Sequence, residues 1–185
     1  MKIFTFLCFG FAVLLAGCVG SDLKTQSSNL AQIDSLAQLC GRFENLPGGK
    51  HYRDDPALTD ILFPSEKGLR DAEFVCVSPA GESAILCEVL RGETVLAKKQ
   101  FTAGVDFVIE KGQIPLSSHA SDLGSSQPQS LVLAAGSEGW TIALTGSGDI
   151  VLMKRSRGVG MVFMLVPIMI KEDYDYLFRR LDRKG

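Results

Sequence analysis

The sequence predicts a mainly β fold in which short antiparallel strands follow one another as a meander. From Asp71 onward, apolar and polar residues alternate over short runs, and glycine-rich turns separate these runs. Alternation with a period of two places the apolar side chains on one face of a strand. A meander of this kind closes most readily as a barrel or as a two-sheet sandwich.

Nine strands are expected in this part of the chain. They are residues 72–78, 83–91, 94–102, 105–110, 130–135, 140–145, 149–155, 161–170 and 174–181. Breaks are expected at Ser117–Gln129, Gly136–Gly139 and Gly158–Gly160, because glycine and serine favour turns. The segment Met161–Ile170 is apolar at successive positions, so both faces of its strand are expected to be covered.

One or two short helices are expected ahead of the sheet. Apolar residues recur at helical spacing between residues 29 and 39, which predicts a short amphipathic helix that can cover the outer face of Met161–Ile170. A partner subunit or a bound lipid is the alternative cover. A second helix is expected from Asp55 to Phe63, since Asp55 can cap it and Pro64 ends it.

The first eighteen residues have the form of an export signal. Lys2 precedes an apolar run, Ile3–Leu15, which is too short to span a bilayer as a helix. The run ends in Leu15-Ala16-Gly17-Cys18, which resembles the lipobox of bacterial lipoproteins. This resemblance implies that residues 1–17 are a signal peptide and that the mature chain begins at a lipidated Cys18, whose fatty acids (palmitate among them) anchor the protein.

Composition and length predict the organisation of the mature chain, and the resemblance implies its location. Residues 18–29, rich in serine and other polar residues, are expected to form a tether, and residues 30–185 are expected to form a single β-rich domain. Val19 stands where many Gram-negative lipoproteins retained in the inner membrane carry Asp, so the expected location is the outer membrane, facing the periplasm. In a Gram-positive host the same anchor would hold the protein on the cell membrane.

Charge and composition exclude several classes of protein. The chain has 19 basic and 21 acidic side chains, a near-neutral balance without the strongly basic footprint of a nucleic-acid-binding protein. No cluster of cysteine and histidine has the spacing of a metal site, and no cofactor is expected. A Gly-x-Ser-x-Gly nucleophile elbow is also absent, which argues against the commonest serine hydrolases.

Three cysteines remain available in an oxidising compartment: Cys40, Cys76 and Cys87. If the hairpin around Gly81 centres on Gly81-Glu82, Cys76 and Cys87 lie opposite each other on one face, close enough for a disulfide after a small adjustment. Two buried free thiols, or a bond from Cys40, are the alternatives.

A second resemblance concerns the start and the end of the sheet. Gly41-Arg42-Phe43, with Arg179 or Arg180 near the chain end, resembles the lipocalin-like (calycin) pattern, in which a Gly-x-aromatic packs beneath a basic side chain. The resemblance implies a barrel closed by a structural cation–π pair between Phe43 and Arg180. Phe43 stands where lipocalins usually have Trp, and the helix expected after Asp55 interrupts the early strands.

These observations predict a non-enzymatic envelope lipoprotein that binds an apolar ligand in its barrel. The expected lining is Trp140, Met153, Phe163 and Leu165. The alternative function is a structural or protein-interaction module of the envelope, including an inhibitor or immunity-type lipoprotein. The expected partners are therefore the membrane, through covalent lipid, and either an apolar ligand or an envelope protein.

Overall fold

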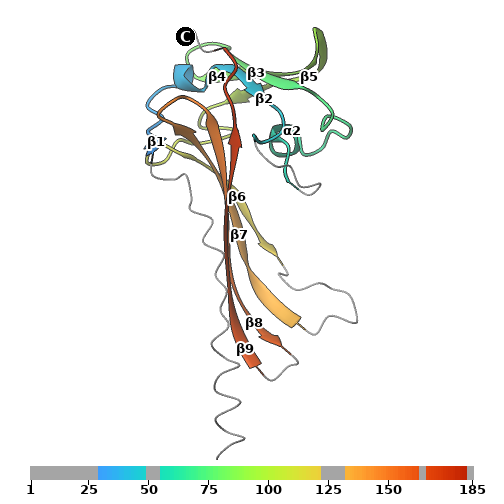
Figure 1. Ribbon diagram of the computed structural model, residues 1–185. Helices are drawn as coiled ribbons and strands as arrows, with labels where there is room; N and C mark the ends of the chain where they lie inside the picture. The colour runs from blue at the N-terminus through green and yellow to red at the C-terminus, as the bar shows by residue number, and fades with distance from the viewer. Residues whose placement is uncertain (1–28, 49–54, 122–131, 163–165, 183–185) are drawn as a thin grey trace, which may run out of the picture.

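The computed structural model describes residues 29–48, 55–121, 132–162 and 166–182 as a body of curled antiparallel sheet from which a long ribbon of strands extends (Figure 1). In chain order the strands are β1 (Leu30–Ala31), β2 (Gly41–Glu44), β3 (Phe74–Pro79), β4 (Ala84–Arg91), β5 (Thr94–Thr102), β6 (Ile114–Ser121), β7 (Val132–Thr145), β8 (Ile150–Val162) and β9 (Val166–Phe178). A 3₁₀ helix, η2 (Leu36–Leu39), and one short α-helix, α2 (Leu58–Leu62), complete the described elements.

The strands form two antiparallel sheets that the end of the chain joins. One sheet has the order β2-β3-β4-β5, and the other has the order β1-β7-β8-β9 with β6 also paired to β7. Beyond β9 the chain pairs with β2: Phe43 and Arg180 form an antiparallel bridge, and the Leu181 amide donates to the Arg42 carbonyl at 2.7 Å. The pairing therefore continues from one sheet into the other, and the antiparallel meander predicted from the sequence is confirmed.

Side chains of the body fill the space between the two sheets. The largest of those that are fully buried come from both sheets, from α2 and from the extended segment before η2: Phe43, Phe178, Ile33, Leu58, Leu152, Val75 and Val89. A smaller cluster of Ala143, Val151 and Met153 lies on the other face of β7 and β8. Burial of apolar side chains from both sheets is the main force that holds the curl together.

The segment before β2 is largely extended, where a helix over residues 29–39 was expected. Leu30 pairs with Thr145 of β7, and the Ile33 amide donates to the Gly112 carbonyl, so these backbone groups bond to other strands instead of to a helical turn. Only η2 is helical, and the Gln38 side chain caps it by accepting from the Ser35 amide. The expected helix is therefore wrong: Ile33 reaches the core from extended chain, and Leu39 reaches it from the single 3₁₀ turn η2.

The helix expected from Asp55 is shorter than predicted and is capped differently. It begins after Ala57, whose amide donates to the Asp60 carboxylate at 2.8 Å. Asn45, which is fully buried, fixes its position by accepting from the Thr59 amide and donating to the carbonyl of Ala72. The side-chain amide of Asn45, the residue that follows β2, thus attaches the helix to β2.

Strand limits in the second sheet also differ from those predicted. Residues 105–110 form a turn followed by irregular chain with isolated bridges at Phe107 and Glu110. Ile114–Ser121, partly assigned to a polar loop, is β6. The expected turns at 136–139 and 158–160 lie inside β7 and β8, where Gly136 pairs with Gly158. Neighbours on both sides supply ladder hydrogen bonds, which offset the weak strand preference of glycine. Turns do occur at Gly92 and Gly148, whose φ angles of 58° and 81° suit glycine.

Candidate functional site: the three-stranded ribbon

The feature that distinguishes this molecule from a simple curled sheet is the ribbon made by the far parts of β7, β8 and β9. The register is regular: Val132–Leu144 of β7 pairs with Ile150–Val162 of β8, and the whole of β9 pairs with β8. Figure 1 shows these strands continuing well beyond the body as a twisted ribbon. We call residues 132–141, 153–162 and 166–175 the ribbon.

Aromatic and charged groups pack together on one face of the ribbon where it leaves the body. The Trp140 indole N–H donates to Glu138 at 2.7 Å, and Lys154 Nζ lies 2.9 Å from Glu138 and 5.3 Å from the Trp140 ring centroid. Tyr176 stacks on Trp140 with ring centroids 6.2 Å apart. Partial burial of the Tyr176 phenol disfavours its charged form and raises its pKa above the usual value. These contacts join all three strands.

Ion pairs cross the opposite face between β8 and β9. Arg155 lies 2.6 Å from Asp175 and 3.8 Å from Asp173, and Arg157 lies 2.6 Å from Asp173. The hydrogen bond from Arg157 holds the pKa of the Asp173 carboxyl below its ordinary value. Opposite charges in cross-strand positions stabilise a sheet, so this ladder strengthens the part of the ribbon nearest the body.

Beyond the ion pairs the character of the ribbon changes to apolar. Val159 and Met169 face each other in register and are 66% and 87% exposed. Arg157 and Lys171, the next paired positions toward the body on this face, are also exposed. The ribbon therefore presents an exposed apolar pair bordered by cations.

The predicted ligand-lining residues do not form one surface. Trp140 pairs with Lys154, and Thr141 pairs with Met153, so Trp140 and Met153 lie on opposite faces of the sheet. Trp140 packs against the main core, whereas Met153 is buried in the smaller cluster. Phe163 and Leu165 lie outside the described residues, as does Cys18. Residues 136–139 were expected to be a turn, although they lie inside β7. The alternation of side chains along this continuous strand, which places Trp140 and Met153 on opposite faces, was therefore not apparent from the sequence.

The predicted facing of Cys76 and Cys87 is wrong. Cys76 pairs with Glu88 and Cys87 with Val77, so the two cysteines point to opposite faces of the hairpin. The turn is centred half a residue later than Gly81-Glu82, and a one-residue change of register reverses which side chains share a face. Both thiols are free, and burial raises the pKa of Cys87 to about 12.

Phe43 and Arg180 lie together at the junction of the sheets. The guanidinium carbon of Arg180 is 5.9 Å from the Phe43 ring centroid, and its Nη2 donates to the Cys40 carbonyl at 2.5 Å. Gly41 permits this approach, because a Cβ atom at residue 41 would lie 2.8 Å from Arg180 Nε. The cluster is structural, since its polar atoms bond to the protein's own backbone and to Asp182.

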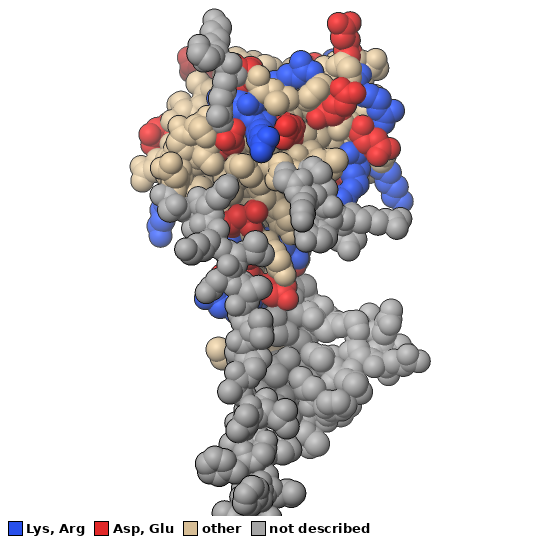
Figure 2. All heavy atoms as spheres, in the orientation of Figure 1, with Lys and Arg blue, Asp and Glu red and all other residues tan. Residues whose placement is uncertain are grey.

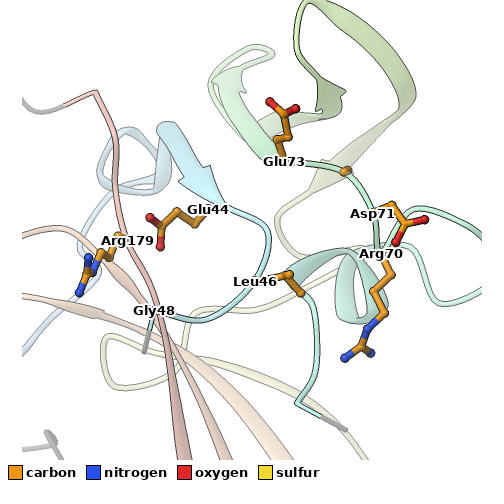
Figure 3. A pocket seen from close by; sticks show the side chains of 8 residues that line it. Glu44, Leu46, Gly48, Arg70, Asp71, Glu73 and Arg179 are labelled. Atoms are coloured by element: carbon orange, nitrogen blue, oxygen red, sulfur yellow. The ribbon is translucent and has the colours of Figure 1, made fainter. Parts of the chain in front are cut away.

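A cleft of about 510 Å³ opens beside this junction (Figure 3). Its lining is Glu44, Leu46, Gly48, Arg70, Asp71, Ala72, Glu73 and Arg179, which includes five charged side chains. Figure 3 shows Glu44 and Arg179 on one side and Arg70 and Asp71 on the other. Pockets for apolar ligands are lined mainly by apolar and aromatic side chains, so this cleft does not suit such a ligand.

Neither a metal-binding cluster nor a membrane-spanning helix is found in the part of the chain that the structure describes. Within those residues, no three side chains of histidine, cysteine, aspartate or glutamate are grouped so as to hold a metal ion. The described helices include none with the length and apolarity needed to cross a bilayer. On the visible face of the body, acidic and basic side chains are interspersed (Figure 2).

Comparison with known proteins gives no match: no family model, no curated protein and no solved structure is similar to this chain.

Proposed function

We propose that this chain is a lipid-anchored protein of the cell envelope, attached through Cys18, which works without catalysis as a structural and interaction module at the membrane surface. The observation that carries this proposal is the ribbon, whose exposed pair Val159 and Met169 lies beyond the ion pairs that brace it. Exposed apolar surface bordered by polar residues is typical of sites that bind a protein or a membrane.

The packing of the body favours this function over an apolar-ligand carrier. Phe43, Phe178 and Leu152 are fully buried in one core cluster between the sheets. A carrier would keep a ligand cavity in this position. The described cleft is lined mainly by charged side chains. The body is therefore better suited to hold the ribbon in place than to carry a ligand.

The location that we propose is the periplasmic face of the outer membrane. Support comes from the sequence Leu15-Ala16-Gly17-Cys18 and from Val19 after it. Two or three acyl chains suffice for stable attachment, since one chain alone binds only marginally.

The test begins with palmitate labelling in the host. We expect the wild-type chain to incorporate labelled palmitate and the Cys18→Ser variant to incorporate none. Native mass spectrometry of the lipidated protein, released gently from detergent, then separates the two functions. If the proposal is right, the measured mass is that of the lipidated chain alone or of its complex with another protein. Absence of label would contradict the anchor, and a stoichiometric apolar small molecule would favour the carrier.

A further inference from the structure

The far end of the ribbon is apolar over five consecutive cross-strand rows. These rows are Val132–Val162–Val166, Leu133–Met161–Pro167, Ala134–Gly160–Ile168, Ala135–Val159–Met169 and Gly136–Gly158–Ile170. We call these fifteen residues the apolar tip. None of them has a charged or hydrogen-bonding side chain, and the next row, Ser137–Arg157–Lys171, brings two cations.

We infer that the apolar tip inserts into the lipid surface to which the protein is anchored, with the row Ser137–Arg157–Lys171 at the level of the headgroups. This inference rests on the proposed lipid attachment and names what the ribbon binds.

Composition favours lipid over a protein groove. Successive residues of a strand point to opposite faces, so both faces of the tip have the same apolar character. A sheet that docks on a protein through one face normally keeps polar residues on the other. A segment that enters lipid meets the same apolar medium on both sides, which is what these five rows require.

Dimensions limit the insertion to one leaflet. Rows spaced about 3.3 Å apart extend about 13 Å from the first to the fifth, less than half of the hydrocarbon core of about 30 Å. The outer edge of β9 pairs with no other described strand between Val166 and Tyr176. Unpaired backbone groups are costly in hydrocarbon, so the tip stays near the boundary between headgroups and acyl chains, where water and headgroups can bond to that edge.

The border row fits the headgroup region. Arg157 and Lys171 are both exposed, and their long side chains can extend along apolar surface while their charges reach anionic headgroups. Arg157 also bonds to Asp173, which partly neutralises its charge, so apolar burial and not net charge supplies most of the attraction.

The length of the tether agrees with this arrangement. Leu30 pairs with Thr145, at the end of β7 away from the tip, and nine residue steps of strand separate Thr145 from Gly136, about 30 Å. Eleven residue steps separate Cys18 from Asn29, which reach at most about 36–40 Å when extended. A lipid on Cys18 can therefore lie in the same leaflet that the tip enters.

The test uses the lipidated full-length mature protein, reconstituted in vesicles of phosphatidylethanolamine and phosphatidylglycerol that contain a brominated phosphatidylcholine. Bromine quenches tryptophan only at close range in the acyl region. Met169→Trp places the probe on the tip, and Val105→Trp is the matched control, because Val105 is 81% exposed on a turn of the body. Trp140, the one native tryptophan, provides a background that is subtracted from both variants.

We expect the tryptophan at residue 169 to be quenched about twofold by the brominated lipid, as burial at the acyl boundary requires, and the tryptophan at residue 105 to be unaffected. Circular dichroism of both variants verifies the fold. If the protein floats with the vesicles and residue 169 stays open to aqueous acrylamide, the insertion is wrong and the anchor stands. Shielding of residue 169 from both quenchers would assign the tip to contact with another copy of the chain and would also overturn the inference. If the wild-type protein fails to float, the proposed anchor and the insertion fall together.

Discussion

Arg180 lies over Phe43 at the junction of the two sheets, with its guanidinium carbon 5.9 Å from the ring centroid and its Nη2 2.5 Å from the Cys40 carbonyl oxygen. The same arginine donates through its backbone amide to Asp149 at 2.8 Å. These bonds connect the end of β9, the β7–β8 turn and the start of β2. The junction is therefore the point at which removal of one side chain affects both sheets.

Replacement of Arg180 by Met keeps an unbranched apolar side chain and removes the charged guanidinium group. We expect the free energy of unfolding to fall by about 1–3 kcal/mol, from loss of the cation–π contact and of the charged hydrogen bond to Cys40, discounted for partial exposure. Urea denaturation measures the change. Arg91→Met, at the exposed end of β4, is the control and should change stability by less than about 0.5 kcal/mol. Equal losses in the two variants would contradict the role of the junction.

A methyl group at residue 41 should disturb the same junction. In Gly41→Ala the new Cβ would lie 2.8 Å from Arg180 Nε, so the arginine must move, at a cost of about 1–3 kcal/mol. The cost should shrink when Arg180 is already Ala, because the obstructing atoms are gone. A double-mutant cycle by urea denaturation measures this coupling, and strictly additive effects would rule out the contact.

The ion pairs of the ribbon should weaken in acid. The pKa of Asp173 is lowered from its ordinary value of 3.8 by Arg157, so its stabilising effect is present above about pH 4 and is lost as the pH falls through the lowered value. We expect the urea midpoint, followed by Trp140 fluorescence, to fall between pH 5 and pH 3. Asp173→Asn should lower the midpoint at pH 5 and reduce this pH dependence. Glu82→Gln, an exposed turn residue, should do neither.

The thiol of Cys87 should make stability fall in alkali. Its pKa is raised to about 12 in the folded chain from 9.0, so the unfolded chain loses the proton first as the pH rises. The stability contributed by the buried thiol is complete below pH 9 and decreases by up to about 4 kcal/mol through pH 12. Cys87→Ala should show a correspondingly shallower decline in stability over this range. Parallel declines in the two proteins would contradict the assignment.

Cys76 and Cys87 should remain unlinked in the protein isolated from an oxidising compartment. The hairpin register places them on opposite faces, and a disulfide would require a one-residue slip that exposes the buried face of β4. Non-reducing peptide mapping measures this directly. A peptide that joins the two cysteines would show that the register differs.

The expected strands were most accurate where turns contain glycine with positive φ. Residues 83–91 and 94–102 were placed within one residue of β4 and β5. The turn between them needs a positive φ, which glycine adopts readily, so Gly92 marks the turn in the sequence itself. The prediction was wrong where glycine lies inside a long strand, at Gly136 and Gly158, since the pairing that holds these residues comes from neighbours distant in sequence. The same dependence on distant partners explains the extended chain at Leu30 and Ile33.

Sequence alone determined that the chain is an antiparallel β meander, because alternation of apolar residues and local turn chemistry are short-range properties. It also brought Gly41, Phe43 and Arg180 together as a group, through a resemblance to a known pattern. The tertiary structure decided the hairpin register, the joining of the sheets through Arg180, and the ribbon with its exposed Val159 and Met169. Each of these depends on which strands pair and at which residue, and a shift of one residue exchanges the two faces of a strand, so only the folded arrangement fixes them.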